Sequence, residues 1–220
     1  SSILSVVVMT SAALLLFAQE QAWSNAFALN EATGLYERVG GSDLFTNGFR
    51  YLNWLIDVPM LLFQILFVVT ITKEVRNRYR NQFFFSGPMM IITGYIGQFY
   101  ETTQMVPFLV WGAISTVFFF HVLILIRRVI VEGNKDLSAG NQKLMNTIWW
   151  IFLVSWFLYP GGYLFPIVGG LDVSPEWAVV GRQMTYTIAD IASKIIYGVL
   201  LNVVSTNRSV EEGYVEGAAA

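Results

Sequence analysis

Long apolar stretches constrain the fold of this chain more than any other feature of its sequence. They cover residues 2–18, 52–72, 84–100, 105–130, 145–166 and 177–205. Each can cross the roughly 30 Å hydrocarbon core of a bilayer as a helix, which rises about 1.5 Å per residue. Because backbone polar groups must be satisfied inside lipid, we expect an all-α transmembrane helix bundle with six visible spans.

Composition agrees with a lipid environment and excludes other classes of protein. Of the 220 residues, 55% are hydrophobic and only 13% are charged, whereas about a quarter are charged in a soluble domain. The net charge of −2 offers no attraction to nucleic acid, so we expect no such partner. The sequence has no cysteine, which excludes a disulfide framework and a thiolate metal site. We expect one transmembrane domain over residues 1–220, with lipid as its surroundings.

The start of the chain differs from a secretory leader. A signal peptide begins with basic residues, whereas this chain begins Ser1-Ser2-Ile3, without an initiator methionine. We therefore interpret residues 1–18 as a true span and expect the native gene product to be longer at this end.

Charges between the spans predict the orientation in the membrane. Basic residues gather in two connections, and they are Lys73, Arg76, Arg78, Arg80, Arg127, Arg128, Lys135 and Lys143. The positive-inside rule assigns both connections to the cytoplasm. We therefore expect a multi-pass protein of the cell (inner) membrane with an extracellular loop at 19–48 and a cytoplasmic tail at 206–220. The turn-rich residues 40–43 suggest a short hairpin in that loop.

Four polar side chains mark one face of the second span. Arg50, Asn53, Asp57 and Gln64 follow one another at spacings of three, four and seven residues, which places them on one helical face. Such a stripe can serve as interhelical hydrogen bonding alone. An ionisable group inside a span is costly, however, and by default indicates function.

The last span carries Arg182, Asp190 and Lys194. Asp190 and Lys194 are one turn apart, so their side chains can meet as a structural ion pair. Lys194 is also near the middle of the span, and a desolvated lysine is a nucleophile suited to forming an imine with an aldehyde. A protonated imine needs a nearby carboxylate, and Asp57 and Asp190 are the two candidates.

Residues 50–59 (RYLNWLIDVP) and 190–194 (DIASK) resemble the third and seventh helices of microbial rhodopsins. This resemblance implies their seven-helix fold, with only the second to seventh spans visible here. It implies all-trans retinal bound to Lys194 as a protonated Schiff base, in a pocket walled by Trp54, Trp156, Tyr159 and Pro160. Asn53, Asp57 and Gln64 match the Asn-Asp-Gln triplet of the light-driven sodium-pumping subgroup.

The resemblance implies an outward sodium pump. Asp57 would be the main counterion and Asp190 a second carboxylate. Transfer of the imine proton to Asp57 would remove the positive barrier and let Na⁺ cross. The subgroup also implies a homo-oligomer, with a pentamer as its usual form.

Further residues take roles in the ion path by the same resemblance. Ser5 and Gln64 would line the cytoplasmic entry, and Ser11 would hydrogen-bond near Asp57, although a serine in a helix can simply bond to its own backbone. Arg50 would separate the retinal centre from an exit cavity formed by Asn47, Glu101 and Arg182. Asp43 resembles a residue that helps to hold a non-transported Na⁺ between protomers.

Three other functions use the same residues differently. An outward proton pump would use the same scaffold, but Gln64 cannot donate a proton. A light sensor would signal through a partner and need a slow photocycle. A retinal-free channel or secondary transporter would use the buried charges without absorbing visible light.

Overall fold

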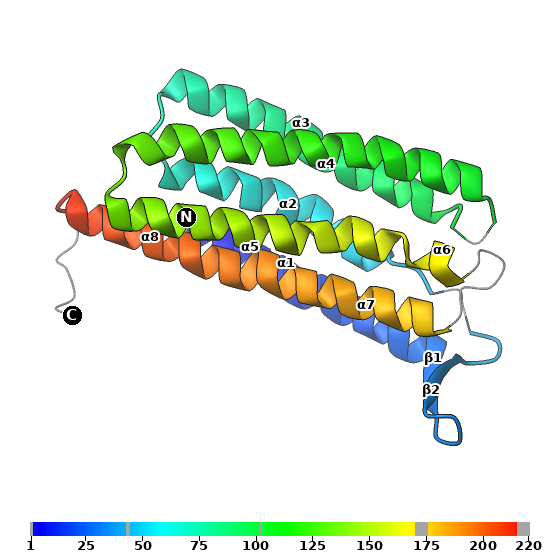
Figure 1. The fold of residues 1–220 in the computed structure, drawn as a ribbon. Coiled ribbons are helices and arrows are strands. Elements are labelled where there is room, and N and C mark those ends of the chain that lie inside the picture. Colours follow the sequence, from blue (N-terminus) through cyan, green and yellow to red (C-terminus); the bar gives the residue numbers. More distant parts are fainter. Residues whose placement is uncertain (1, 43–44, 102, 170–175, 215–220) are drawn as a thin grey trace.

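The computed structural model describes residues 2–42, 45–101, 103–169 and 176–214. Long helices in these ranges run side by side along one axis, and a short hairpin extends from one end (Figure 1). The helices are α1 (Ser2–Ala26), α2 (Gly48–Val68), α3 (Lys73–Gln98), α4 (Met105–Gly133), α5 (Ala139–Tyr163), α6 (Phe165–Gly169), α7 (Glu176–Asp190) and α8 (Tyr197–Glu211). A π-helical segment, Ile191–Ile196, joins α7 to α8 as one continuous rod. The expected all-α bundle is confirmed.

Five of the described helical rods are long and apolar enough to cross a membrane. They are Ile3–Ala26, Gly48–Val68, Met105–Asp136, Ala139–Ile167 and Ala178–Glu211. The expected span at 84–100 lies mostly on α3, which begins at Lys73. The first turns of α3 carry Lys73, Arg76, Arg78 and Arg80, so its average apolarity is lower than that of the other rods.

The long loop expected at 19–48 is shorter in the structure, because residues 19–26 continue α1. Gln19 and Glu20 follow the expected span, and both are part of α1. Gln19 points inward and donates to the Thr46 carbonyl at 2.9 Å, while Ser24 donates to Glu20 one turn away at 2.7 Å. Polar side chains at the end of a span are therefore satisfied without leaving the helix.

A short hairpin follows α1, as expected for this loop, and the turn-rich residues 40–42 lie after it. Strands β1 (Phe27–Asn30) and β2 (Leu35–Arg38) pair antiparallel, with Phe27 opposite Arg38. The turn lies at residues 31–34, where Gly34 has φ of +69°, a value that a residue with a side chain rarely adopts. Residues 40–42 follow β2, and residue 43 lies outside the described residues.

The centre of the bundle is formed around α2. Two thirds of the α2 span (67%) is buried, against 11% of α1. The main core brings Leu62 and Ile65 of α2 together with Phe83 of α3 and Phe152 of α5. Polar residues on the stripe of α2 therefore point into the protein and not toward lipid.

The two connections that carry the basic residues lie at the same end of the bundle. The α2–α3 and α4–α5 connections lie at the end where α8 finishes, and the hairpin and α6 lie at the other end (Figure 1). The expected tail at 206–220 is helical as far as Glu211. The Glu211 carboxylate accepts hydrogen bonds from Ser138 and Asn141 at the start of α5, which holds this last turn in place. Residues 215–220 lie outside the described residues.

Candidate functional site

Lys194 lies at the centre of the bundle between two carboxylates. Its Nζ is 3.0 Å from Oδ1 of Asp190, one turn earlier on the same rod, and 3.2 Å from Oδ2 of Asp57 on α2. All three side chains are buried. Lys194 is part of the π-helical segment, a rare geometry that is found frequently at functional sites.

Asn53 connects the lysine to the carboxylate of Asp57. Its side-chain oxygen accepts a hydrogen bond from the Lys194 amine. Its Nδ2 donates to Asp57 Oδ2 at 2.7 Å and lies 3.0 Å from Oγ of Ser11 on α1. The four-residue spacing of Asn53 and Asp57 makes their contact possible, because residues four apart are neighbours on a helix.

The two carboxylates have different surroundings. Oδ2 of Asp190 is 2.6 Å from Arg50, and its Oδ1 accepts from the Trp54 indole and the Tyr159 hydroxyl, both at 2.9 Å. The Oδ1 atom of Asp57 is buried and has no hydrogen-bond partner among the described residues. Both oxygens of Asp190 therefore have hydrogen-bond partners, whereas Asp57 retains one acceptor atom without a partner among the described residues.

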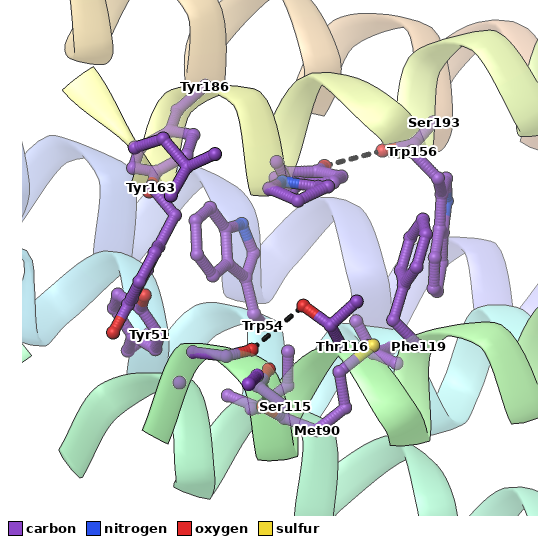
Figure 2. Close-up of a pocket in the computed structure, with 18 of the residues that line it drawn as sticks. Tyr51, Trp54, Met90, Ser115, Thr116, Phe119, Trp156, Tyr163, Tyr186 and Ser193 are labelled. Carbon is purple, nitrogen blue, oxygen red and sulfur yellow. Dashed lines mark hydrogen bonds between the residues drawn. The ribbon is translucent and has the colours of Figure 1, made fainter. Parts of the chain in front are cut away.

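A cavity of about 440 Å³ begins at Lys194, a size typical of small-molecule sites. Trp54, Trp156, Tyr159 and Pro160 lie on its wall. Figure 2 shows the indole rings of Trp54 and Trp156 around this space, with Tyr51 and Tyr163 toward one end and Phe119 toward the other. An apolar, aromatic cavity with an amine in its wall fits retinal, a long polyene with one aldehyde.

Glycine residues shape the wall of this cavity, and the sequence patterns did not identify them. A Cβ on Gly112 would lie 2.7 Å from the Tyr163 ring, and one on Gly162 would lie 2.5 Å from the Tyr186 ring. The absence of a side chain at these positions lets both tyrosines pack against the helices. Glycines inside apolar helices give no periodic signal, so only the tertiary contacts show their function.

Gln64 lies on the opposite side of Asp57 from Arg50, two helical turns along α2. Its Nε2 donates to Ser5 of α1 at 2.8 Å, and its Oε1 is buried without a hydrogen-bond partner in the described part of the chain. The residues assigned to the ion entry are therefore in direct contact. No carboxylate is hydrogen-bonded to either side chain among the described residues.

Residues assigned to the exit cavity form two separate groups. Arg182 pairs with Glu101 at 2.5 Å. Asn47 instead donates to Gln98 at 3.0 Å and accepts from Gln183 at 2.6 Å. The glutamines were not among the predicted site residues, because a polar residue near a helix end is ordinary and carries no positional signal.

Arg50 is held from several directions. Besides its ion pair with Asp190, it lies 3.3 Å from Thr187 of α7. Its backbone N–H donates to the side-chain oxygen of Gln19 at 3.1 Å. Gln19 was also absent from the predicted site residues, because its position in the sequence is typical of the beginning of a loop.

The structure gives no metal cage among the described residues. No group of three or more His, Asp or Glu side chains is placed to hold a metal ion in that part of the chain. Asp43, the residue assigned to an interface Na⁺, lies outside the described residues.

Comparisons with known proteins agree with this arrangement. Residues 1–207 match the family described as bacteriorhodopsin-like protein. The green-light absorbing proteorhodopsin of a gamma-proteobacterium is 23% identical over 156 residues, which cover 70% of this chain and 59% of that protein. Bacteriorhodopsin-II of Haloarcula marismortui is 29% identical over 75% of this chain and 62% of its own length. The matched region is thus less than two thirds of either relative.

Solved structures extend the likeness to nearly the whole chain. Xanthorhodopsin, described as a light-driven ion pump with dual chromophore, superposes with a TM-score of 0.82 and 28% identity. The superposition covers 96% of this chain and 81% of xanthorhodopsin. The chain belongs to the bacteriorhodopsin-like family, the microbial rhodopsins.

Proposed function

We propose that this protein is a light-driven pump that exports Na⁺ and carries all-trans retinal on Lys194. Proteins of this family bind retinal through a lysine. The observation that carries the proposal is the buried contact of the Lys194 amine with Asp57 and Asn53, at the wall of a cavity that fits retinal. Xanthorhodopsin, which is similar in fold and sequence, supports light-driven ion transport as the class of activity.

The chemistry of the pump depends on where a proton can go. Retinal supplies light absorption and a light-driven change of shape next to the Lys194 nitrogen. Asp57 is the acceptor that the geometry favours, because its Oδ1 has no other partner among the described residues. Both oxygens of Asp190 already have partners in Arg50, Trp54 and Tyr159, so this carboxylate has no unoccupied acceptor atom.

Proton transfer removes the charge that blocks a cation. A positive charge at Lys194 repels Na⁺ strongly in a medium of low dielectric constant. Once the proton has moved to Asp57, the nitrogen and the carboxyl group are both neutral. The side-chain oxygens of Asn53 and Asp57 then offer ligands of the type that a hard cation prefers. Return of the proton to Lys194 restores the barrier behind the ion.

Gln64 favours sodium over protons as cargo. An outward proton pump must return a proton to Lys194 from the entry side, and a carboxyl group on the α2 stripe would serve that purpose. The stripe instead has an amide, bonded to the hydroxyl of Ser5. An amide side chain cannot donate a proton at neutral pH, but its oxygen can contact a passing cation.

An outward proton pump is the second candidate. Asp57 is placed to accept a proton from Lys194 in either mechanism, since the pair is 3.2 Å apart. The two functions therefore differ only in the steps after this transfer, and transport in defined salts separates them.

The proposal includes an orientation and an assembly. We assign the α2–α3 and α4–α5 connections and the C-terminal end to the cytoplasm of a cell with this protein in its inner membrane. The grouping of these basic connections at one end of the bundle supports that orientation. We also propose a homo-oligomer, a pentamer by family resemblance, in which residues 1–220 form a single transmembrane domain in each protomer.

Light-driven pH changes in a cell suspension show which ion the protein transports. Cells that express the protein and are supplied with retinal are illuminated in NaCl and in KCl, with and without a protonophore. Export of Na⁺ draws protons inward, so the medium becomes alkaline in NaCl and the protonophore enlarges the signal. Lys194→Ala, which removes the attachment point, is the control and is expected to give no signal.

The opposite pattern identifies the second candidate. Acidification of the medium in both salts, abolished by the protonophore, would show proton export and refute the sodium proposal. Absence of visible absorption after addition of retinal would refute both pumps.

A further inference from the structure

A second cavity lies far from Lys194, between α3 and the last turns of α4. Its volume is about 310 Å³, and it is lined by Tyr79, Arg127, Arg128, Val131, Glu132 and Lys135. The lining thus contains three cations and one carboxylate. None of these cations forms an ion pair among the described residues. The cavity therefore has unsatisfied positive charge.

The carboxylate in this cavity is held by a neighbouring helix. Glu132 Oε2 accepts a hydrogen bond from the Tyr79 hydroxyl of α3 at 3.1 Å. Burial, together with this hydrogen bond, raises the pKa of Tyr79, so the phenol remains a donor at neutral pH. The contact draws Glu132 toward α3, although its spacing from Arg128 and Lys135 would allow an ion pair with either.

Arg127, unlike the other two cations, has partners on α5, and its guanidinium lies 3.5 Å from Oδ1 of Asn146. Its guanidinium lies over the ring of Trp149 on α5, 5.7 Å from the ring centre. Arg128 and Lys135 have no hydrogen-bond partner among the described residues. These two side chains are consequently the ones available to an anion from outside the protein.

An exposed apolar strip on α4 leads to these cations. Val117, Ile124 and Val131 are 68%, 49% and 51% exposed and recur every seven residues, or about two turns. Arg128 lies one turn beyond Ile124, and Lys135 lies one turn beyond Val131, so the two cations flank Val131 at the last turns of α4. A surface with this order of groups matches a phospholipid, whose acyl chain is followed by a charged phosphate.

We propose that the cavity between α3 and α4 binds the phosphate of an anionic phospholipid, with Arg128 and Lys135 as its charge partners. One acyl chain lies along Ile124 and Val117, which precede both cations on α4. Basic pockets between transmembrane helices on the cytoplasmic side are suited to such headgroups. Cations near the end of a helix also stabilise its dipole, but that effect requires neither a cavity nor an adjoining exposed strip.

Native mass spectrometry of the whole protein in detergent tests this site. Phosphatidylglycerol is titrated against the native protein and against the double variant Arg128→Gln/Lys135→Gln. Each cation near the surface contributes about 1 kcal/mol, so the double variant should bind roughly 30-fold more weakly. Lys73→Gln/Arg80→Gln is the matched control, because it removes two exposed cations from the same end without touching the cavity.

The variant Glu132→Gln provides a test that a folding defect cannot imitate. Removal of the carboxylate should strengthen binding about 5-fold, a gain that misfolding cannot produce. Lys135 lies in the exposed 3₁₀ turn after α4. The single variant Lys135→Gln should weaken binding about 5-fold.

Three results would overturn the proposal. Equal losses in the two double variants would indicate a general attraction of the basic end for anionic lipid. Equal binding of phosphatidylcholine would show that the cations do not select the headgroup. Complete displacement of phosphatidylglycerol by millimolar inorganic phosphate would assign the cavity to a soluble anion.

Discussion

Replacement of Asp57 with Asn is expected to shift the absorption of the retinal-bound protein to longer wavelength. Asp57 Oδ2 is 3.2 Å from Lys194 Nζ in a fully buried site. At an effective dielectric constant of about 20, a pair of unit charges at this distance attracts with about 5 kcal/mol. The amide side chain preserves the shape of the residue but removes this attraction.

The size of the shift depends on the movement of charge on excitation. Light moves positive charge away from the linking nitrogen, so a nearby carboxylate stabilises the ground state more than the excited state. If about half of the 5 kcal/mol is lost on excitation, its removal lowers the transition energy by about 2–3 kcal/mol. For visible light this corresponds to a red shift of roughly 20–30 nm.

Absorption spectra of the purified protein with retinal measure the shift, and light-driven pH changes in cells measure transport. Asp57→Asn should shift the spectrum and abolish transport, since the proton has lost its acceptor. Glu101→Gln is the control, because it is also a carboxylate-to-amide change but pairs with Arg182 and does not line the cavity. Its absorption maximum should remain unchanged.

The reasoning fails if Asp57→Asn leaves the absorption maximum where it was. A red shift found only in Asp190→Asn would transfer the counterion role to Asp190. It would also mean that Arg50 does not offset the negative charge of Asp190 at the Lys194 nitrogen.

Three further changes test other parts of the structure. Gln64→Glu introduces a carboxyl group on the entry side, and light-driven acidification in KCl should increase; an unchanged signal would contradict the role given to this position. Arg182→Gln leaves Glu101 without its partner and should destabilise the protein by about 3–5 kcal/mol, measured as earlier thermal loss of the retinal absorbance. Gly133→Ala places a Cβ 2.4 Å from Cβ of Val69 and should cost about 1–3 kcal/mol in the same assay, where an unaltered melting curve would disagree with the packing.

Local periodicity made the fold and one face of the site predictable. The stripe of Arg50, Asn53, Asp57 and Gln64 could be placed on one face because a helix has a fixed angle per residue. All four are buried in the structure. The pairing of Asp190 with Lys194 is likewise expected from their spacing of four residues.

The ends of the elements were less predictable. Residues 19–26 continue the helix, and the hairpin turns at Gly34, where the Gly34 N–H bonds to the Asn30 carbonyl. Gln19 is part of α1, and its side chain is satisfied by the Thr46 carbonyl, 27 residues away. A polar residue read along the chain gives no information about such a partner.

The sequence alone determined which helices this protein has, which of their faces are polar and which lysine lies inside a span. Those properties depend on neighbours within a few residues, and the chain encodes them directly. Only the tertiary structure decided that Asp190 is saturated by Arg50, 140 residues earlier, while Asp57 keeps an oxygen without a partner among the described residues. The roles of two chemically identical carboxylates therefore depend on hydrogen-bond partners on other helices, which only the packing of the bundle brings within reach.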